Sequence, residues 1–243
     1  MLIKVEHIEV FNFEGAIRGL RNPMNSWDKS DSHWCSGHKF EDCKTTADKC
    51  PRKDDNFDCD VYCVGKADLD LMKRLYNASL NGDNHAHRKF LRQIFVSMDI
   101  IAPDYFFKEF STYKVGVVEN STSTMHRITS KEFELTDFSY DYDDAIELHY
   151  ADCIDDKIEH LNYLREEYLK TKDKRYWRLL IQELPMSYLY RRTVTMNYEN
   201  VMTIINQRSD HKLSEWRSYC EILRDLPYIK EIRGETDEQT NKE

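Results

Sequence analysis

The chain has 243 residues, 40% hydrophobic and 12% aromatic, which is enough to bury a substantial core in one domain. Its formal net charge of -9 argues against a general nucleic-acid-binding protein, because contacts to many phosphates need a basic surface. No apolar run approaches the roughly 20 residues of a membrane span, and the first residues lack the order of a secretory signal. We therefore expect a soluble, cytoplasmic protein with no membrane partner.

The first 80 residues predict two regular elements on either side of an irregular segment. Residues 2–13 predict a strand, and its apolar side chains change face near His7, which predicts a bulge or turn there. Residues 68–80 predict a helix that begins with Asp68 as its cap. Between them, residues 30–64 have almost no apolar periodicity and read as an insertion.

This insertion is rich in cysteine. It carries five cysteines and two histidines among many Lys and Asp residues. Such a segment does not easily form its own core, and a tetrahedral zinc site would stabilise it. The spacing matches no standard zinc finger; disulfides are one alternative, which no export signal favours, and a loop whose cysteines share no role is another. The candidate zinc ligands, of which some four are needed, are Cys35, His38, Cys43, Cys50, Cys59 and Cys63.

The remaining elements follow from hydrophobic periodicity. Residues 94–100 alternate as a half-buried strand does, and residues 154–170 and 177–184 have helical spacing. The acidic and aromatic segment 137–144 lacks the spaced carboxylates of a calcium loop, so we expect a solvated loop. Residues 234–243 hold no aliphatic or aromatic side chain and predict a disordered polar tail.

Arg208 occupies an unusual place in the pattern. Apolar residues recur at helical spacing from Val201 to Leu223, with neither Gly nor Pro between Pro185 and Pro227, and Arg208 falls within this stripe. A guanidinium on a buried face must be paired or must face a ligand, because an unpaired buried charge is costly. The alternative is that its stem packs while its charged end reaches solvent or a structural carboxylate.

The same region resembles a known family. Leu184-Pro185, then Asn197, then a helix ending in Asn206-Gln207-Arg208 with Trp216 beyond it, are similar to the C-terminal signature of flavin-dependent thymidylate synthases. A second block, from His87 to His126, resembles the segment of that family that leads through a strand and Ala-Pro to its hallmark motif. The two blocks cover under half of the chain and lie in the right order.

The chain departs from the hallmark, which is Arg-His-Arg followed by Asn-Glu-x-Ser-x-Arg. An ungapped alignment puts Lys114 on the second arginine and Asn120 on the glutamate. A shift by one residue instead puts Tyr113 on that arginine and Glu119 on the glutamate, and Ile181 replaces a further phosphate-binding arginine. Lysine offers only a point charge where arginine forms a planar fork. The residues that could replace the lost arginines are Arg127, Arg178, Arg191 and Arg192.

The resemblance implies two groups of binding residues and no protein nucleophile, because in this chemistry the flavin performs the difficult step. The hydroxyl-rich run could donate hydrogen bonds to an anion, although it is also an ordinary turn composition. The implied nucleotide-binding residues are Arg208, Ser121, Thr122, Ser123 and Arg178, and the implied flavin-binding residues are His87, Lys114, Tyr113, Asn120 and Asn197.

We expect one α+β domain over residues 1–233, with a mainly antiparallel sheet flanked by long helices. The resemblance implies a homotetramer that binds FAD and dUMP and methylates the nucleotide with methylenetetrahydrofolate, a folate, as the one-carbon donor. One alternative is a protein that keeps the scaffold but acts as a non-catalytic nucleotide-binding or protein-interaction module. Another is a related enzyme that modifies a different pyrimidine nucleotide.

Overall fold

The computed structural model describes residues 3–35, 61–80 and 85–235. The chain forms two compact units. The first comprises residues 1–8, 97–195 and 210–219, and the second comprises residues 9–96, 196–209 and 220–243. The predicted α+β fold class is confirmed, since helices accompany an antiparallel sheet.

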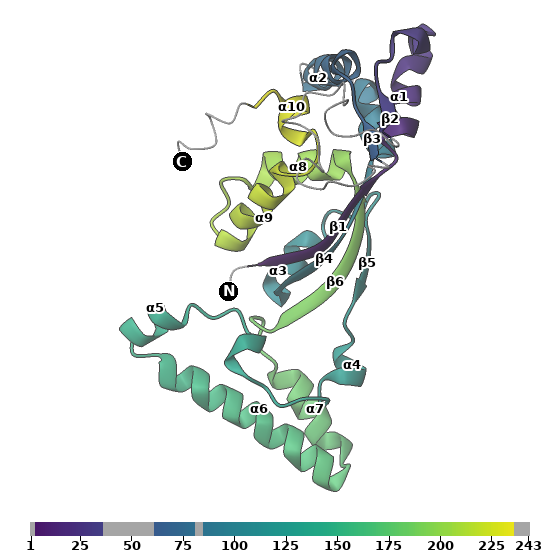
Figure 1. Ribbon diagram of the computed structural model, residues 1–243. Coiled ribbons are helices and arrows are strands. Elements are labelled where there is room, and N and C mark those ends of the chain that lie inside the picture. The colour runs from purple at the N-terminus through teal and green to yellow at the C-terminus, as the bar shows by residue number, and fades with distance from the viewer. Residues whose placement is uncertain (1–2, 36–60, 81–84, 236–243) are drawn as a thin grey trace. The chain divides into compact units, whose positions relative to one another are not determined.

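The main sheet has four strands in the order β1-β4-β6-β5 (Figure 1). Strand β5 pairs antiparallel with β6, and Ser121 lies opposite Arg192. The predicted alternation in β4 is confirmed, because every second residue from Val96 to Ile100 is buried. His7 has a positive φ of 52°, which confirms the predicted irregularity in β1. The strands are β1 (Lys4–Phe11), β4 (Phe95–Pro103), β5 (Val118–Ser121) and β6 (Leu189–Asn197).

An aromatic core lies in the first unit, where helix α3 (Asp104–Phe110) meets the start of α9 (Ser214–Arg224). The rings of Phe106 and Trp216 are 4.3 Å apart between centroids, and both residues are fully buried. The Tyr105 hydroxyl donates a hydrogen bond to the buried carboxylate of Glu215. Ring packing and this hydrogen bond therefore both join α3 to the beginning of α9.

A helical hairpin also belongs to the first unit (Figure 1). Helix α6 (Ala151–Thr171) packs on α7 (Lys174–Glu183), and the two helices confirm the predicted ones, each starting a few residues earlier than predicted. The Asp173 side chain caps α7 by accepting a hydrogen bond from the Arg175 amide at 2.9 Å. The loop predicted at 137–144 is only partly correct, because Phe138 is buried and α5 (Tyr142–Glu147) begins within it.

In the second unit, helix α2 corrects one prediction. The helix spans Lys66–Leu80, but Asp68 does not cap it. The carboxylate of Asp31 accepts hydrogen bonds from the first amides of the helix, at 2.8 Å from Ala67 and 3.2 Å from Asp68. Asp68 is instead fully buried and pairs with Arg21 at 2.7 Å. Local sequence spacing could not reveal this pair, because its partners come from distant segments.

The other elements of the second unit are short helices and a two-stranded sheet. The α-helices are α1 (Phe13–Arg21), α8 (Tyr198–Arg208) and α10 (Ile229–Arg233). The 3-10 helices are η1 (Asn22–Met24), η2 (Trp27–Lys29) and η5 (His85–Gln93), and the small sheet pairs β2 (His33–Cys35) with β3 (Val61–Cys63). None of the helices within the described ranges has the length and hydropathy needed to cross a membrane.

The apolar stripe predicted around Arg208 belongs to two helices and not to one. Helix α8 ends at Arg208, and α9 begins six residues later at Ser214. In the intervening turn the His211 ring accepts the Leu213 amide through Nδ1 at 3.2 Å, and Arg217 donates to the His211 carbonyl at 2.6 Å. Arg208 is half-buried at a helix end, so the stripe alone does not force it into a core.

Candidate functional site

A pocket of about 220 Å³ lies in the first unit, just beyond the end of β5. Most of the side chains that line it are of three kinds. Hydroxyl groups come from residues 122–124, positive charges from Arg127 and Lys131, and aromatic rings from Phe133, Tyr188 and Tyr190. Pockets that enclose drug-sized ligands typically reach roughly 300–1,000 Å³. This pocket therefore suits part of a mononucleotide better than a dinucleotide.

Backbone hydrogen bonds shape the hydroxyl-rich side of the pocket. Thr122 extends the pairing of β5 with β6 by one residue, because its amide and its hydroxyl both donate to the Arg191 carbonyl, at 2.9 and 3.0 Å. The chain then enters the single turn α4 (Thr124–Arg127), in which the Arg127 amide donates to the Ser123 carbonyl at 3.1 Å. The strand end thus leads directly to the arginine that lines the pocket.

The aromatic side of the pocket consists of rings in edge-to-face contact. The rings of Tyr188 and Tyr190 are 5.3 Å apart, and Phe133 packs against Tyr188 at 6.1 Å. Burial raises the pKa of Tyr188 to about 12, and burial with nearby Asp104 raises the pKa of Tyr190. Both phenols stay neutral at physiological pH. They can therefore pack against a ring or donate a hydrogen bond without repelling an anion.

Arg192 lies on the same strand as Tyr190, two residues farther along β6. Its Nη1 donates to Glu119 Oε2 at 2.7 Å, and its Cζ lies 4.1 Å from the centroid of the Phe107 ring. Among the described residues its buried Nε has no hydrogen-bond partner. Glu119 is the residue placed on the glutamate of the hallmark by the shifted alignment, and it is held here by an arginine of the neighbouring strand.

Arg191 does not share this environment. Its guanidinium pairs with Glu6 at 2.8 Å and with Asp99 at 3.2 Å, two carboxylates of strands β1 and β4. Successive side chains of a strand point to opposite faces of the sheet, so the neighbouring residues Arg191 and Arg192 of β6 lie on opposite faces. Of these two candidates for the lost arginines, Arg192 is the one beside Tyr190.

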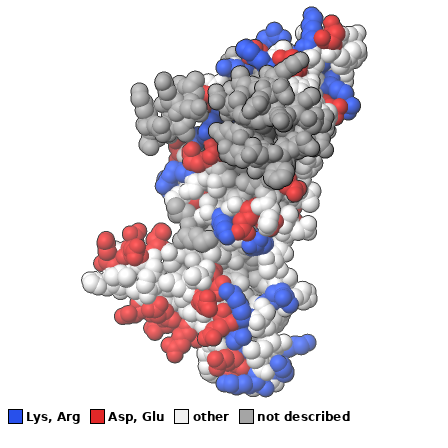
Figure 2. All heavy atoms as spheres, in the orientation of Figure 1, with Lys and Arg blue, Asp and Glu red and all other residues white. Residues whose placement is uncertain are grey.

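A second, larger concavity in the first unit has the opposite charge. It measures about 590 Å³ and is lined by the carboxylates of Glu132, Asp155, Glu159 and Glu166. Figure 2 shows acidic side chains gathered over α5 and the adjoining part of α6. This surface would repel a nucleotide phosphate, so the pocket beyond β5 is the better candidate of the two.

The structure separates the nucleotide-binding residues predicted in the first unit. Thr122 and Ser123 line the pocket, together with Arg127, the predicted replacement for the last arginine of the hallmark. Ser121 is exposed and donates to the Thr122 carbonyl at 3.2 Å. Arg178 is exposed on α7 and is not part of the pocket lining.

Sequence reasoning missed Lys131, Phe133, Tyr188 and Tyr190 as pocket residues. The alternation of Tyr188 with Tyr190 next to the Leu-Pro signature was the available signal for two of them. Lys131 and Phe133 carry no pattern of their own. They reach the pocket only because the chain turns back after α4.

The predicted flavin-binding residues fall in both units. In the first unit, Tyr113 is half-buried against the Phe110 and Trp216 rings, whereas Lys114 and Asn120 are exposed. In the second, His87 is exposed on η5 and Asn197 is 8% exposed at the start of α8.

Two observations bear on whether these residues fit FAD. Asn197 caps α8, because its Oδ1 accepts the Asn200 amide at 3.1 Å. Arg88 and Arg92, close to His87 in sequence, both pair with Glu199. Neutral donors and a ring suit the flavin, but Lys114 is the one permanent cation of the predicted set. The set therefore matches the flavin ring better than the diphosphate, which needs more positive charge.

The cysteine-rich insertion is described only at its two ends. Cys35 and Cys63 are buried on β2 and β3 with their Sγ atoms 3.4 Å apart, and His33 Nε2 lies 3.6 Å from Cys35 Sγ. His38, Cys43, Cys50 and Cys59 lie outside the described residues. Within the described part of the chain, no group of three or more ligating side chains could hold a metal ion. The structure thus does not support the zinc site, which stays a prediction.

Solved structures show which fold this is. The chain is similar to a flavin-dependent thymidylate synthase, ThyX, from Helicobacter pylori in complex with FAD and dUMP, with a TM-score of 0.60 and 17% identity over 96% of this chain and 97% of that one. A second structure of thymidylate synthase X from the same organism, with FAD and dUMP, gives a TM-score of 0.59 and 18% identity over 96% of each chain.

These similarities confirm the resemblance at the level of the fold. The protein has the fold of flavin-dependent thymidylate synthases, as the order of its two sequence blocks predicted. No protein-family model and no curated protein sequence matches the chain. A shared fold does not by itself determine activity, which depends on the residues of the site.

Proposed function

We propose that the protein binds a pyrimidine nucleotide, dUMP, and uses FAD for reductive methylation with methylenetetrahydrofolate. The observation that carries this proposal is the pocket beyond β5. In it, the hydroxyls at the end of the segment that carries the hallmark motif, and Arg127 just beyond them, lie beside Tyr188 and Tyr190 from the other sequence block. FAD and dUMP are proposed as the ligands because both similar solved structures were determined with FAD and dUMP bound.

Each kind of side chain has a part in this proposal. Arg127 and Lys131 neutralise the nucleotide phosphate, while the hydroxyls of Thr122 and Ser123 donate hydrogen bonds to its oxygens. Tyr188 and Tyr190 pack against the pyrimidine ring and limit the access of water. FAD, when bound, supplies the hydride. The protein orients the nucleotide and offers no nucleophile of its own.

Calorimetric titration with dUMP tests this assignment. Arg127→Ala should weaken binding by about 1.5–3 kcal/mol, the range for a charge-assisted hydrogen bond. The matched control is Arg175→Ala, which removes an exposed arginine paired with Asp173 on the same unit and should leave dUMP affinity unchanged. Equal dUMP affinities of wild type and Arg127→Ala would show that the nucleotide does not bind in this pocket.

FAD binding has a separate test. Because Lys114 replaces an arginine and the Arg88 and Arg92 side chains are already paired, FAD should bind weakly and be lost in part during purification. The visible spectrum of freshly purified protein, followed by titration with added FAD, measures this directly. Flavin bands that saturate with added FAD support the redox function.

A non-catalytic module is the second candidate function. The replacement of arginines by Lys114 and Ile181 favours it, because these positions no longer supply bidentate contacts to phosphate. Binding of dUMP without any flavin bands, even with excess FAD, would select this alternative. Tighter binding of another pyrimidine nucleotide than of dUMP would select the related enzyme.

A further inference from the structure

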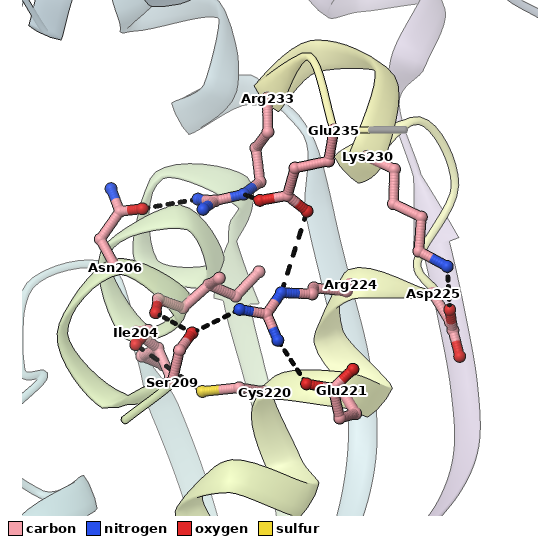
Figure 3. Close-up of polar contacts among 11 residues, drawn as sticks. Ile204, Asn206, Ser209, Cys220, Glu221, Arg224, Asp225, Lys230, Arg233 and Glu235 are labelled. Atoms are coloured by element: carbon pink, nitrogen blue, oxygen red, sulfur yellow. Dashed lines mark hydrogen bonds and ion pairs between the residues drawn. The ribbon is translucent and has the colours of Figure 1, made fainter. Parts of the chain in front are cut away.

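Two arginines of the second unit converge on a single carboxylate (Figure 3). Arg233, at the end of α10, donates through Nε to Glu235 Oε1 at 2.5 Å. Arg224, at the end of α9, brings its Nε to 3.8 Å from Glu235 Oε2. The two arginine side chains are only 14% and 16% exposed. Like charges come together at such depth only with carboxylates to compensate them: Glu235 lies beside both arginines, and Glu221 also pairs with Arg224.

The guanidiniums are also held by groups other than Glu235. Arg233 Nη1 donates to Asn206 Oδ1 at 2.6 Å, and Arg224 Nη2 donates to Ser209 Oγ at 2.7 Å (Figure 3). Both partners are neutral and lie at the end of α8. These two partners orient the guanidiniums, and Glu221 in addition pairs with Arg224 through Nη1. The arrangement therefore does not depend on Glu235 for its geometry.

Glu235 reaches the arginines because of the way α10 ends. Gly234 adopts φ 76°, in the left-handed region, and the Glu235 amide donates back to the Lys230 carbonyl at 2.9 Å. This is the hydrogen bond that closes a glycine-terminated helix and turns the chain back on itself. The carboxylate is thus attached to the site by one short turn, and its side chain is still 27% exposed to solvent.

The carboxylate matches this site incompletely. A nitrogen–oxygen separation of 3.8 Å is too long for a hydrogen bond, so Glu235 hydrogen-bonds one arginine and only attracts the other. A tetrahedral oxyanion carries more oxygens in more directions and can meet both forks, which are suited to bidentate contact with phosphate. The better ligand for these two arginines is therefore of the phosphate type.

We propose that Arg224 and Arg233 form a second anion site, which binds inorganic phosphate or the phosphoryl group of a small molecule, and that Glu235 occupies it as a tethered competitor. Neither arginine belongs to the segments that resemble the flavin-dependent thymidylate synthases. The site is also independent of the proposed dUMP pocket, whose lining residues are all in the first unit. Ligand binding displaces Glu235 and frees the turn after α10.

Titration of the full chain with inorganic phosphate, followed by calorimetry and by 31P NMR line width, tests this site. A tethered competitor acts at an effective concentration in the millimolar range, so Glu235→Gln should bind phosphate at least about tenfold more tightly than wild type. Arg233→Gln added to that variant should abolish the gain. The matched control is Asp225→Asn, which removes an exposed carboxylate of the same unit that pairs with Lys230, and it should bind phosphate as wild type does.

Additional binding measurements distinguish the possible ligands and outcomes. Displacement of phosphate by methyl phosphate assigns the site to phosphoryl groups of small molecules, and its absence assigns it to the free ion; both support the site. Binding of dUMP that is unchanged in Arg233→Gln shows that this site and the proposed nucleotide pocket stand or fall separately. Equal phosphate affinities of wild type and a folded Glu235→Gln overturn the proposal. If Glu235→Gln does not fold, phosphate line broadening in wild type that persists in Arg233→Gln overturns it as well.

Discussion

The guanidinium of Arg192 lies over the ring of Phe107, with 4.1 Å between Cζ and the ring centroid, while it pairs with Glu119 on the neighbouring strand. The side chains of Arg192 and Glu119 are 17% and 26% exposed, so water screens their attraction only in part. This contact connects β5, β6 and α3 beside the candidate pocket. It gives the segment that carries the degenerate hallmark a rigid support.

Removal of this support should destabilise the protein. Arg192→Ala loses a cation–π contact and a charge-assisted hydrogen bond and leaves Glu119 without its arginine, so we expect a loss of about 2–4 kcal/mol in the free energy of unfolding. Arg191→Ala is the matched control, because its 45% exposed side chain makes surface pairs that contribute at most about 1 kcal/mol. Urea denaturation of both variants measures the difference. Equal losses would show that Arg192 is only another surface arginine.

Asp68 should set part of the acid sensitivity of the second unit. Burial tends to raise the pKa of this carboxyl, but hydrogen bonds from Ser30, Ser32 and Arg21 outweigh it, and the pKa is lowered. A pKa that is lower in the folded state contributes stability above the unfolded value of about 4, and this stability is lost as pH falls through the folded value. Wild type should therefore lose stability with acid more steeply than Asp68→Asn.

The same substitution has a measurable cost at neutral pH. Asp68→Asn leaves Arg21, itself 6% exposed, without its counter-charge, so we expect a loss of about 3 kcal/mol or more. Asp70→Asn is the control on the same helix, since it breaks only an exposed pair with Lys66. Thermal melts between pH 3 and pH 7, roughly the range that brackets the carboxyl pKa, compare the three proteins. Parallel pH profiles of wild type and Asp68→Asn would exclude this role.

The contrast between Asp68 and β4 indicates how far sequence patterns extend. Alternation from Val96 to Ile100 identified a strand because burial there depends on period alone. Asp68 stands where a cap is expected, yet Asp31 performs that role from a distant segment. The pocket has the same origin, because Lys131 and Tyr188 meet only after the chain has folded. Local periodicity predicted the elements, while the pairing of charges depended on tertiary contacts.

The quaternary state is a further prediction from the family resemblance. We expect a homotetramer, because the resemblance implies sites built from several subunits and closed symmetry is the usual form of soluble homo-oligomers. Light scattering at micromolar concentration should return about four times the chain mass of 29.1 kDa. A mass near that of one chain would argue against sites shared between subunits.

Zinc in the cysteine-rich insertion remains testable. Cys35 and Cys63 lie diagonally across β2 and β3, because Cys35 is opposite Val61 and Cys63 is opposite His33. Their Sγ atoms lie 3.4 Å apart, so either a shared metal ion or a disulfide could join them. Elemental analysis should find about one zinc per chain if one tetrahedral site forms. Less than about a tenth of that, with all thiols titratable in the folded protein, would exclude it.

Arg208, like Ser121 and Arg178, is a predicted nucleotide contact that does not line the pocket. If it binds the phosphate of dUMP, Arg208→Ala should weaken dUMP binding by about 1.5–3 kcal/mol with little change in the melting temperature. Arg208→Lys should restore only part of the loss, because an ammonium group cannot present a planar fork. If Arg208 is instead a structural ion-pair partner at the end of α8, the alanine variant should melt several degrees lower and bind dUMP normally. Calorimetry and thermal melts on the same samples separate these outcomes, and a wild-type oligomer that binds no dUMP, with or without FAD, would end the nucleotide assignment.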